Sequence, residues 1–424
     1  MCRKMKDSGI EWIGKIPVDW DVQPLRGSVV DINEKNNPIK FKNVLSLTNT
    51  RGVIPYEEKG NQGNISKEDL SQYKIAYKDT VIINSMNLKI GSVGYSDYDG
   101  CVSPVYYVLK NKKNSNIKYI NYLFKSEFQK YLGKYGKGIL EIREKISMYD
   151  VMHSYIPVPS IDEQTKIVNY LDDKVSKIDS TIEDNKKSIE LLEEYKKNMI
   201  NKTILEGVRK EKFKFVNTDW FDKIPSSWKI SKIKFKANIN LSYNLDFEDV
   251  DICGYIPMEL LYNGYATPNE IEIDKATSGL TKFINNDIIM AKVTPCFENG
   301  EIAIVNNLRN GIGLGSSELF VFNCHENKIN VEYLFYILQS EQLKEKFKST
   351  MTGTGGLKRV PPNAVKNAYI PIPTEKEQQE IVEYIKKEDN KIQDTIKYRK
   401  QIIEKLEEYK KSLIYEAVTG KMEV

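Results

Sequence analysis

A long internal repeat is the feature of this sequence that most constrains its fold. The phrase YIPVPSIDEQTKIVNYLDD begins at Tyr155 and returns as YIPIPTEKEQQEIVEYIKK from Tyr369. Repeats of about 20–50 residues are typical of solenoids and propellers. These two phrases lie about half the chain length apart, so the repeated unit is a whole domain together with the segment that follows it.

Further phrases recur in the same order along the two halves. They are EWIGKIPVDW and DWFDKIPSSW, KDTVIINSM and NNDIIMAKV, and SPVYYVL and SSELFVF. The repeat therefore predicts two similar globular domains in tandem, each followed by a long helix. The predicted boundaries are 1–160 and 213–372 for the domains, and 161–212 and 373–424 for the helical segments.

Short apolar runs rich in β-branched and aromatic residues dominate the interior of each domain. Examples are TVIIN and VYYVL in the first domain and DIIMAKV and LFVF in the second. Clusters of Gly, Asn and Asp separate them, as is typical of strands joined by turns. A helical stretch precedes a glycine-rich loop in each domain, so the predicted fold class is α+β.

Each repeated phrase also predicts the start of a long helix. The prolines of PVP and PIP stop any preceding helix, and Ser160 and Thr374 are suitable N-caps. Apolar residues then recur at steps of three and four over about six turns, which is typical of a coiled-coil seam. We expect the two helices to pair with each other in an antiparallel coiled coil; the alternative is that each packs only against its own domain. The seam positions are Leu171, Ile178, Ile182, Asn185, Ile189 and Leu192 in the first helix, and Ile385, Ile392, Ile396, Arg399, Ile403 and Leu406 in the second.

Two of these seam residues are polar. Asn185 and Arg399 occupy the same position in the two helices. A polar seam residue commonly fixes the register of a coiled coil at some loss of stability. We expect Asn185 and Arg399 to fix the antiparallel alignment.

Positive charge is unevenly distributed along the chain. The net charge is +4, yet residues 1–160 contain 24 Lys and Arg against 17 Asp and Glu. Residues 213–372 are nearly neutral overall, although residues 341–372 contain six basic and two acidic side chains. This distribution favours an anionic partner, most clearly for the first domain.

Motifs for catalysis or metal binding are missing from the sequence. The two histidines, His153 and His325, have no metal-ligand spacing, and the five cysteines form no CxxC pair. The glycines of GTGGLKR do not have phosphate-loop spacing, and the run GIGLG is followed by a strand pattern where a dinucleotide site needs a helix. We therefore expect a non-catalytic protein without a metal. Because there is no long apolar run and no apolar leader, we also expect a cytoplasmic protein without a membrane partner.

Several phrases resemble one known family. SGIEWIGKIPVDW, YIPVPSIDEQ, YIPIPTEKEQ, LLEEYKKNMI and KLEEYKKSLIYEAVTGK resemble the specificity (S) subunit of type I restriction–modification enzymes, and the resemblance covers nearly the whole chain. It implies that each globular domain is a target recognition domain for one half of a bipartite, asymmetric site in double-stranded DNA. It also implies that the helices set the spacing between the half-sites and dock two methyltransferase (M) subunits, which restriction (R) subunits can join. S-adenosylmethionine, ATP and Mg²⁺ are then expected on the partner subunits, with no cofactor on this chain.

Loop residues with suitable side chains are the candidates for contacting DNA. Arg and Lys favour guanine, Asn and Gln favour adenine, and Thr can bind phosphate. The candidates are Asn49, Arg51, Asn84, Asn87, Lys89, Lys137 and Arg143 in the first domain, and Lys292, Thr294, Thr352, Thr354, Lys358 and Arg359 in the second.

Two other functions remain open at the level of the sequence. One is the specificity subunit of a type IIB-like system, in which a single partner both cuts and methylates DNA. The other is a coiled-coil assembly scaffold whose globular ends bind proteins. A steep loss of binding with rising salt would favour DNA over the scaffold.

Overall fold

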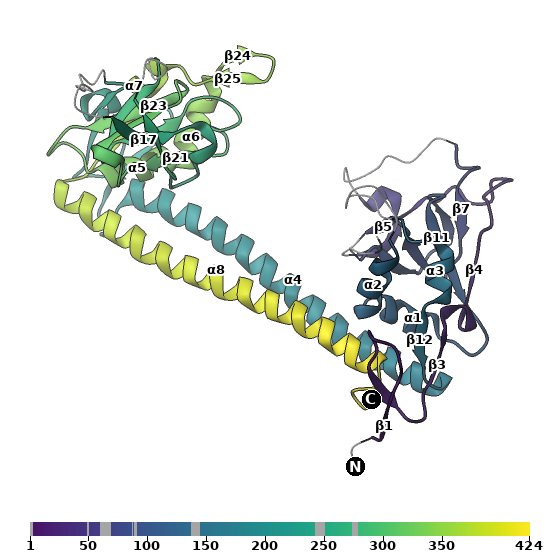
Figure 1. Ribbon diagram of the computed structural model, residues 1–424. Coiled ribbons are helices and arrows are strands. Elements are labelled where there is room, and N and C mark those ends of the chain that lie inside the picture. The colour runs from purple at the N-terminus through teal and green to yellow at the C-terminus, as the bar shows by residue number, and fades with distance from the viewer. Residues whose placement is uncertain are drawn as a thin grey trace. The chain divides into compact units, whose positions relative to one another are not determined.

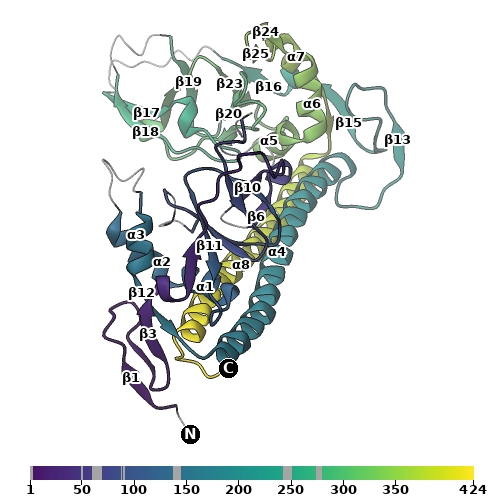
Figure 2. The ribbon, with the colours of Figure 1, turned by 90° about the vertical axis from the view of Figure 1, so that its right-hand side faces the viewer.

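A computed structural model describes most of the chain, which divides into two compact units. The described residues are 3–48, 51–59, 69–86, 88, 91–136, 145–241, 251–273 and 279–424. The first unit comprises Met1–Lys186 together with Lys400–Val424, and the second comprises Lys187–Arg399. Each unit thus combines one globular domain with part of each long helix (Figures 1 and 2). The boundaries inferred from the repeat stay a prediction, because this division cuts both helices.

The first unit is built on a four-stranded antiparallel sheet. Its strands, in spatial order, are β4 (Val29–Asp31), β11 (Tyr106–Asn111), β8 (Thr80–Asn84) and β9 (Val93–Ser96). Side chains of a strand alternate between the two faces of a sheet. Val81 and Ile83 accordingly lie in the larger hydrophobic core of the unit, whereas Ile82 lies in a smaller core on the other face of the sheet.

The other elements of the first unit are short. The strands are β1 (Met5–Asp7), β2 (Lys15–Pro17), β3 (Asp21–Pro24), β5 (Leu45–Thr48), β6 (Gly52–Pro55), β7 (Lys74–Ala76), β10 (Gly100–Val102) and β12 (Tyr155–Val158). The helices are α1 (Ile117–Phe124), α2 (Glu127–Leu132) and α3 (Met148–His153). Strand β12, which is the start of the repeated phrase, pairs with β3.

The second unit repeats this sheet. Its strands, in spatial order, are β16 (Ala237–Ile239), β23 (Leu319–Cys324), β20 (Ile288–Ala291) and β21 (Ile302–Ile304). Again the faces alternate, with Ile288 and Met290 in one core and Ile289 in another. The central pairs β8–β11 and β20–β23 coincide with the repeated interior phrases, which confirms the predicted duplication.

A second sheet and several short elements complete this unit. The sheet contains β18 (Asn269–Glu272), β17 (Ile252–Ile256), β22 (Ile312–Gly315) and β19 (Thr281–Ile284) in that order. The remaining strands are β13 (Phe213–Phe215), β14 (Lys223–Pro225), β15 (Lys229–Lys232), β24 (Thr352–Thr354), β25 (Leu357–Arg359) and β26 (Tyr369–Ile372). The short helices are α5 (Val331–Gln339), α6 (Glu341–Ser349) and α7 (Pro362–Asn367).

Two long helices, α4 (Ile161–Glu206) and α8 (Glu375–Val418), pair within each unit. In the first unit the early part of α4 packs on the late part of α8: Ile178 and Ile182 belong to a core against which Ile403 and Leu406 pack. In the same unit Lys410 Nζ lies 2.5 Å from Asp179 Oδ1. The early part of one helix thus meets the late part of the other.

The second unit contains the complementary halves of the same two helices. There Ile392 and Ile396 of early α8 lie in a core against which Ile189 and Leu192 of late α4 pack. Lys196 Nζ lies 2.7 Å from Asp389 Oδ1. The predicted antiparallel pairing is therefore confirmed, and the helices pack on each other as well as on the domains.

The two polar seam residues differ in burial. Asn185 is buried, and its amide nitrogen donates to Thr181 O of the same helix at 2.8 Å. Arg399 is half-buried. Their role in fixing the register stays a prediction. Among the described residues, no helix has the length and apolar character needed to cross a membrane.

Candidate nucleic-acid interface

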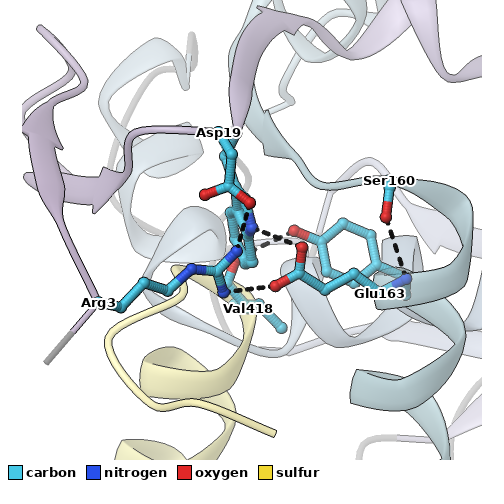
Figure 3. A network of polar contacts seen from close by, with 7 residues as sticks. Arg3, Asp19, Ser160, Glu163 and Val418 are labelled. Atoms are coloured by element: carbon cyan, nitrogen blue, oxygen red, sulfur yellow. Dashed lines mark hydrogen bonds and ion pairs between the residues drawn. The ribbon is translucent and has the colours of Figure 1, made fainter. Parts of the chain in front are cut away.

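The repeated phrase forms a polar joint that fixes each domain to the long helices. In the first unit Glu163, in the first turn of α4, accepts a hydrogen bond from Trp20 Nε1 at 2.9 Å and pairs with Arg3 Nη1 at 2.5 Å (Figure 3). The fully buried Tyr119 hydroxyl lies 3.0 Å from both Pro157 O and Val418 O. This joint therefore attaches the end of α8, as well as the start of α4, to the first domain.

The second unit contains the same joint. Trp228 Nε1 donates to Glu377 Oε1 at 3.4 Å. The buried Tyr333 hydroxyl lies 3.2 Å from Ile204 O and 3.3 Å from Pro371 O. Thr374 and Glu377 form reciprocal contacts of a capping box, with Thr374 N donating to Glu377 Oε2 at 3.0 Å. The phrase is repeated because both joints need the same residues at the same spacing.

The four tryptophans serve this packing. Trp20 and Trp228 are buried at the joints, while Trp12 and Trp220 donate their indole N–H to Tyr155 O and Tyr369 O, at 3.3 and 2.7 Å. The same packing contacts and indole hydrogen bonds thus occur in both units. The tryptophans of the repeat therefore fix the two joints.

Three segments distant in sequence meet at one edge of the second domain. They are the residues after β20, the turn before β23, and the hairpin β24–β25. Val360 N donates to Lys292 O at 2.9 Å, and Thr294 N donates to Lys358 O at 2.9 Å. The structure thus brings together the predicted candidates Lys292, Thr294, Lys358 and Arg359. The hairpin projects on the side of the domain away from the long helices (Figures 1 and 2).

Thr294 anchors the base of this hairpin. Its side chain is buried, and its hydroxyl donates to Gly356 O at 2.7 Å and accepts from Lys358 N at 2.9 Å. The backbone of the hairpin is thus the partner of this hydroxyl both as a donor and as an acceptor. Thr352, Thr354 and Lys358, in contrast, are exposed.

Charged side chains beside the hairpin are held in defined positions. Arg359 donates from Nε and Nη2 to the two carboxylate oxygens of Glu318, both at 2.9 Å. These hydrogen bonds lower the pKa of Glu318, so its carboxylate stays ionised. Lys292 Nζ donates to Ser317 O at 2.6 Å. The Glu318 carboxylate therefore orients the guanidinium of Arg359 at this edge of the domain.

Two of the candidates of the first domain, Arg51 and Asn84, lie among the described residues. Arg51 is exposed in the turn between β5 and β6, where it pairs with Glu58 at 2.7 Å. Asn84 ends β8, and its side-chain oxygen accepts from Met86 N at 3.1 Å. The candidates Asn49, Asn87, Lys89, Lys137 and Arg143 lie outside the described residues.

Two lysines of the first domain, Lys74 and Lys145, were not among the residues that the sequence singled out. Ile146 N donates to Ser85 O at 3.1 Å, which is the counterpart of the bond between Val360 and Lys292. The exposed Lys145 therefore corresponds to Arg359, and counting back from the repeated YIP phrase would have found it. Burial lowers the pKa of Lys74, with Asp31 opposing and Lys145 adding to this shift. Lys74 lies in a short strand and has no sequence signal of its own.

The candidate residues carry side chains that are suited to binding nucleic acid. Among the described residues, no group of three or more His, Cys, Asp and Glu side chains could hold a metal ion. The described candidates instead provide guanidinium, ammonium, amide and hydroxyl groups. These groups suit the phosphates and base edges of nucleic acid.

Comparison with known families gives a match to most of the chain. The model of the type I restriction modification DNA specificity domain matches residues 17–206 and 225–408. The two matched segments correspond to the two halves of the repeat.

Curated relatives are also specificity subunits. The type I restriction enzyme EcoAI specificity subunit of Escherichia coli is 37% identical over 162 residues, or 38% of this chain and 27% of that protein. The EcoEI specificity subunit of the same organism is 32% identical over an equal length. This chain thus spans about a quarter of the length of these E. coli relatives. The putative MjaX specificity subunit of Methanocaldococcus jannaschii is 23% identical over 97% of this chain and 96% of its own length.

Solved structures share the fold over nearly the full length. A chain from a structure on complex assembly and conformational transition of the type I R-M system has a TM-score of 0.73 at 13% identity, covering 96% of this chain and 99% of that chain. The HsdS subunit from Thermoanaerobacter tengcongensis has a TM-score of 0.56 at 14% identity, covering 96% and 98%. At these identities the likeness shows the fold alone.

Proposed function

We propose, because this chain belongs to the type I restriction–modification DNA specificity family, that it is the DNA-recognition subunit of such a complex. Each globular domain binds one half of a bipartite site in double-stranded DNA. The paired helices set the number of base pairs between the halves and dock two methyltransferase subunits. Restriction subunits can join this assembly, which acts on DNA in the cytoplasm.

The observation that carries this proposal is the duplicated domain on an antiparallel helix pair. Two DNA-binding domains joined by a pair of helices suit a split site, because half-site spacing mirrors the spacing of the domains that read it. Linking two modest binding modules also raises the overall affinity without new contacts. The arrangement therefore fits recognition of two separated half-sites.

The half-sites differ in sequence because the two domains differ at corresponding positions. Lys145 stands in the first domain where Arg359 stands in the second, and Val105 stands where Glu318 stands. An arginine fork and a lysine ammonium bind base edges differently. The recognised site is accordingly asymmetric.

The chemistry of the complex resides on the partner subunits. The methyltransferase subunits bind S-adenosylmethionine and modify adenine, and the restriction subunits use ATP and Mg²⁺. This chain supplies recognition. A type IIB-like system would differ in having one partner that both cuts and methylates, and the genes beside this one would distinguish the two.

Mapping of methylated bases tests the proposal. The chain is expressed with its neighbouring methyltransferase, and the DNA is compared with DNA from cells that express the methyltransferase alone. We expect methylated adenines in one split, asymmetric motif that depends on this chain. Unchanged methylation, with the chain soluble and the methyltransferase active, would contradict the proposal.

A binding titration separates DNA recognition from an assembly scaffold. The purified complex is titrated with a duplex that contains the mapped motif, at increasing salt concentrations. A DNA-binding complex should lose affinity steeply, because phosphate contacts release counterions. A scaffold would show no motif-dependent binding at any salt concentration.

A further inference from the structure

We infer that Arg359, held by Glu318 at the base of hairpin β24–β25, reads a guanine in the half-site bound by the second domain. The inference rests on the proposed function and names a specificity-determining residue for it. Arg359 and Glu318 are exposed enough to meet a ligand, with side chains 45% and 27% accessible.

The orientation of the guanidinium is the first argument. Arginine has five N–H donors in a rigid fork. Arg359 uses Nε and one N–H of Nη2 on Glu318, at 2.9 Å each. Both N–H groups of Nη1 and one of Nη2 remain. The edge of the guanidinium formed by Nη1 and Nη2 therefore carries two parallel N–H donors. These donors match the O6 and N7 acceptors of guanine in the major groove.

The hairpin that carries Arg359 is the second argument. A two-stranded ribbon fits the major groove of B-DNA. Thr352 pairs with Arg359 and Thr354 pairs with Leu357 in the ladder, so these four side chains share one face. Residues 352–359 are all exposed and include no acidic side chain. The hairpin residues on this face therefore offer hydroxyl, methyl and guanidinium groups and no acidic side chain of their own.

The role of Glu318 follows from its position. A carboxylate near DNA is repelled by the phosphates, so a surface meant only to bind phosphate would not contain one. Glu318 instead restricts the rotamers of Arg359 and sets which edge of the fork faces outward. Such orientation reduces the entropy lost on binding.

The positions of the first domain that correspond to Glu318 and Arg359 do not carry this pair. In the first domain Val105 occupies the position of Glu318, and Lys145 that of Arg359. Lysine provides a mobile point charge and cannot present two fixed parallel donors. The inference therefore predicts an effect on one half-site and none on the other.

The test compares the methylation motifs of variant complexes. The wild-type chain and Arg359→Ala, Arg359→Lys and Glu318→Gln are each expressed with the partner methyltransferase in cells that lack other adenine methylation. For Arg359→Ala we expect one guanine position of one half-site to become degenerate, with discrimination falling about 5- to 150-fold. Arg359→Lys should lose most of the same discrimination, and Glu318→Gln a smaller part of it.

A matched control is available in the same unit. Arg209 forms an equivalent fork with Glu380, at 2.9 and 2.5 Å, outside the hairpin. Arg209→Ala should leave every position of the motif unchanged. Gel filtration of each complex verifies that the variant chains fold and assemble.

Distinct outcomes separate this inference from the proposed function. An intact motif with Arg359→Ala would overturn the inference and leave the function standing. A uniform loss of methylation at all sites, in a complex that still assembles, would assign Arg359 to phosphate binding and also overturn it. If the wild-type chain directs no split motif, the proposed function itself fails.

Discussion

At the scale of single residues, the buried tyrosine hydroxyls hold the domains on the helices. Tyr333 lies within hydrogen-bonding distance of the carbonyl oxygens of Ile204 and Pro371, and it is fully buried. Burial raises the pKa of this phenol well above its usual range, so the hydroxyl stays protonated and remains a donor. Carbonyl groups left without a partner in such a place are costly.

Tyr333→Phe tests this directly. Removing the hydroxyl should lower the free energy of unfolding by about 1–3 kcal/mol, because it leaves buried carbonyl oxygens without their donor. The measurement is urea denaturation followed by tryptophan fluorescence. Tyr149→Phe is the control, since the Tyr149 side chain is 69% exposed. Equal midpoints for both variants would contradict the role assigned to Tyr333.

A carboxylate in the same joint should make stability depend on pH. Burial raises the pKa of Glu377, but hydrogen bonds from Thr374 and Trp228, together with the charge of Arg209, hold it below the ordinary value of 4.5. A carboxyl whose pKa is lower in the folded state stabilises the fold above the unfolded pKa. That stabilisation disappears as pH falls through the folded pKa.

The variant Glu377→Gln should therefore be less stable than the wild type at neutral pH. The difference should shrink as the pH falls below 4.5. Urea midpoints measured across this range would show it, with Glu375→Gln as the control because Glu375 is exposed in the same turn. A difference that stays constant with pH would exclude this linkage.

Single residues also show how far the sequence can predict the interface. Arg359 and Lys358 were predicted from side-chain type, and the contacts show that they lie beside Lys292 and Thr294. Glu318 could not be found in this way, because its importance depends on a pairing 41 residues away. Thr294 was predicted as a DNA contact, whereas its burial and its bonds to the hairpin depend on tertiary structure.

At the scale of elements, the hairpin β24–β25 was the least predictable part. Its sequence TGTGGLKR was predicted to form a glycine-rich loop. Glycine is unfavourable in strands. The structure instead pairs Thr352–Thr354 with Leu357–Arg359. The long helices and the central strands were predictable because their apolar periodicity extends over many residues.

Gly353 makes this hairpin possible and provides a test of it. Its φ is +147°, and a Cβ there would lie 2.1 Å from Leu357 O. Gly353→Ala should therefore distort the hairpin and weaken recognition of one half-site, while the rest of the motif is kept. The methylation map of the variant complex measures this.

Gly9→Asn is the control for that variant, because Gly9 lies in the first unit and outside the hairpin. Gly9 has φ +71° with no atom near an added Cβ, and asparagine tolerates this conformation. The Gly9→Asn variant should retain the motif. If Gly353→Ala also retained every position, the hairpin would not be part of the interface.

At the scale of the whole molecule, the order of parts in the sequence differs from their grouping in space. The repeat predicts domain, helix, domain, helix, but residues 400–424 belong to the first compact unit. Periodicity predicts that a helix has an apolar stripe without showing which partner will cover it. The contacts of Val418 and Leu413 with the first domain are therefore visible only in the structure.

This grouping predicts which domain responds to loss of the C-terminal residues. Tyr415 OH lies 3.3 Å from Trp12 O and from Ile13 O, and Val418 O lies 3.0 Å from the Tyr119 hydroxyl. Deleting residues 415–424 removes these contacts. Hydrogen exchange should then accelerate in residues 3–24 and 117–124 of the first domain, because their joint is opened.

The second domain is the internal control for this deletion. Its own joint uses Ile204 at the end of α4, which the deletion leaves in place. Exchange in residues 213–235 should stay unchanged when measured by mass spectrometry in the same sample. Faster exchange in both domains, or only in residues 213–235, would contradict the grouping. Loss of protection from hydrogen exchange in the first domain alone would show that residues 415–424 complete the joint of that domain. The end of α4 has the corresponding place in the joint of the second domain.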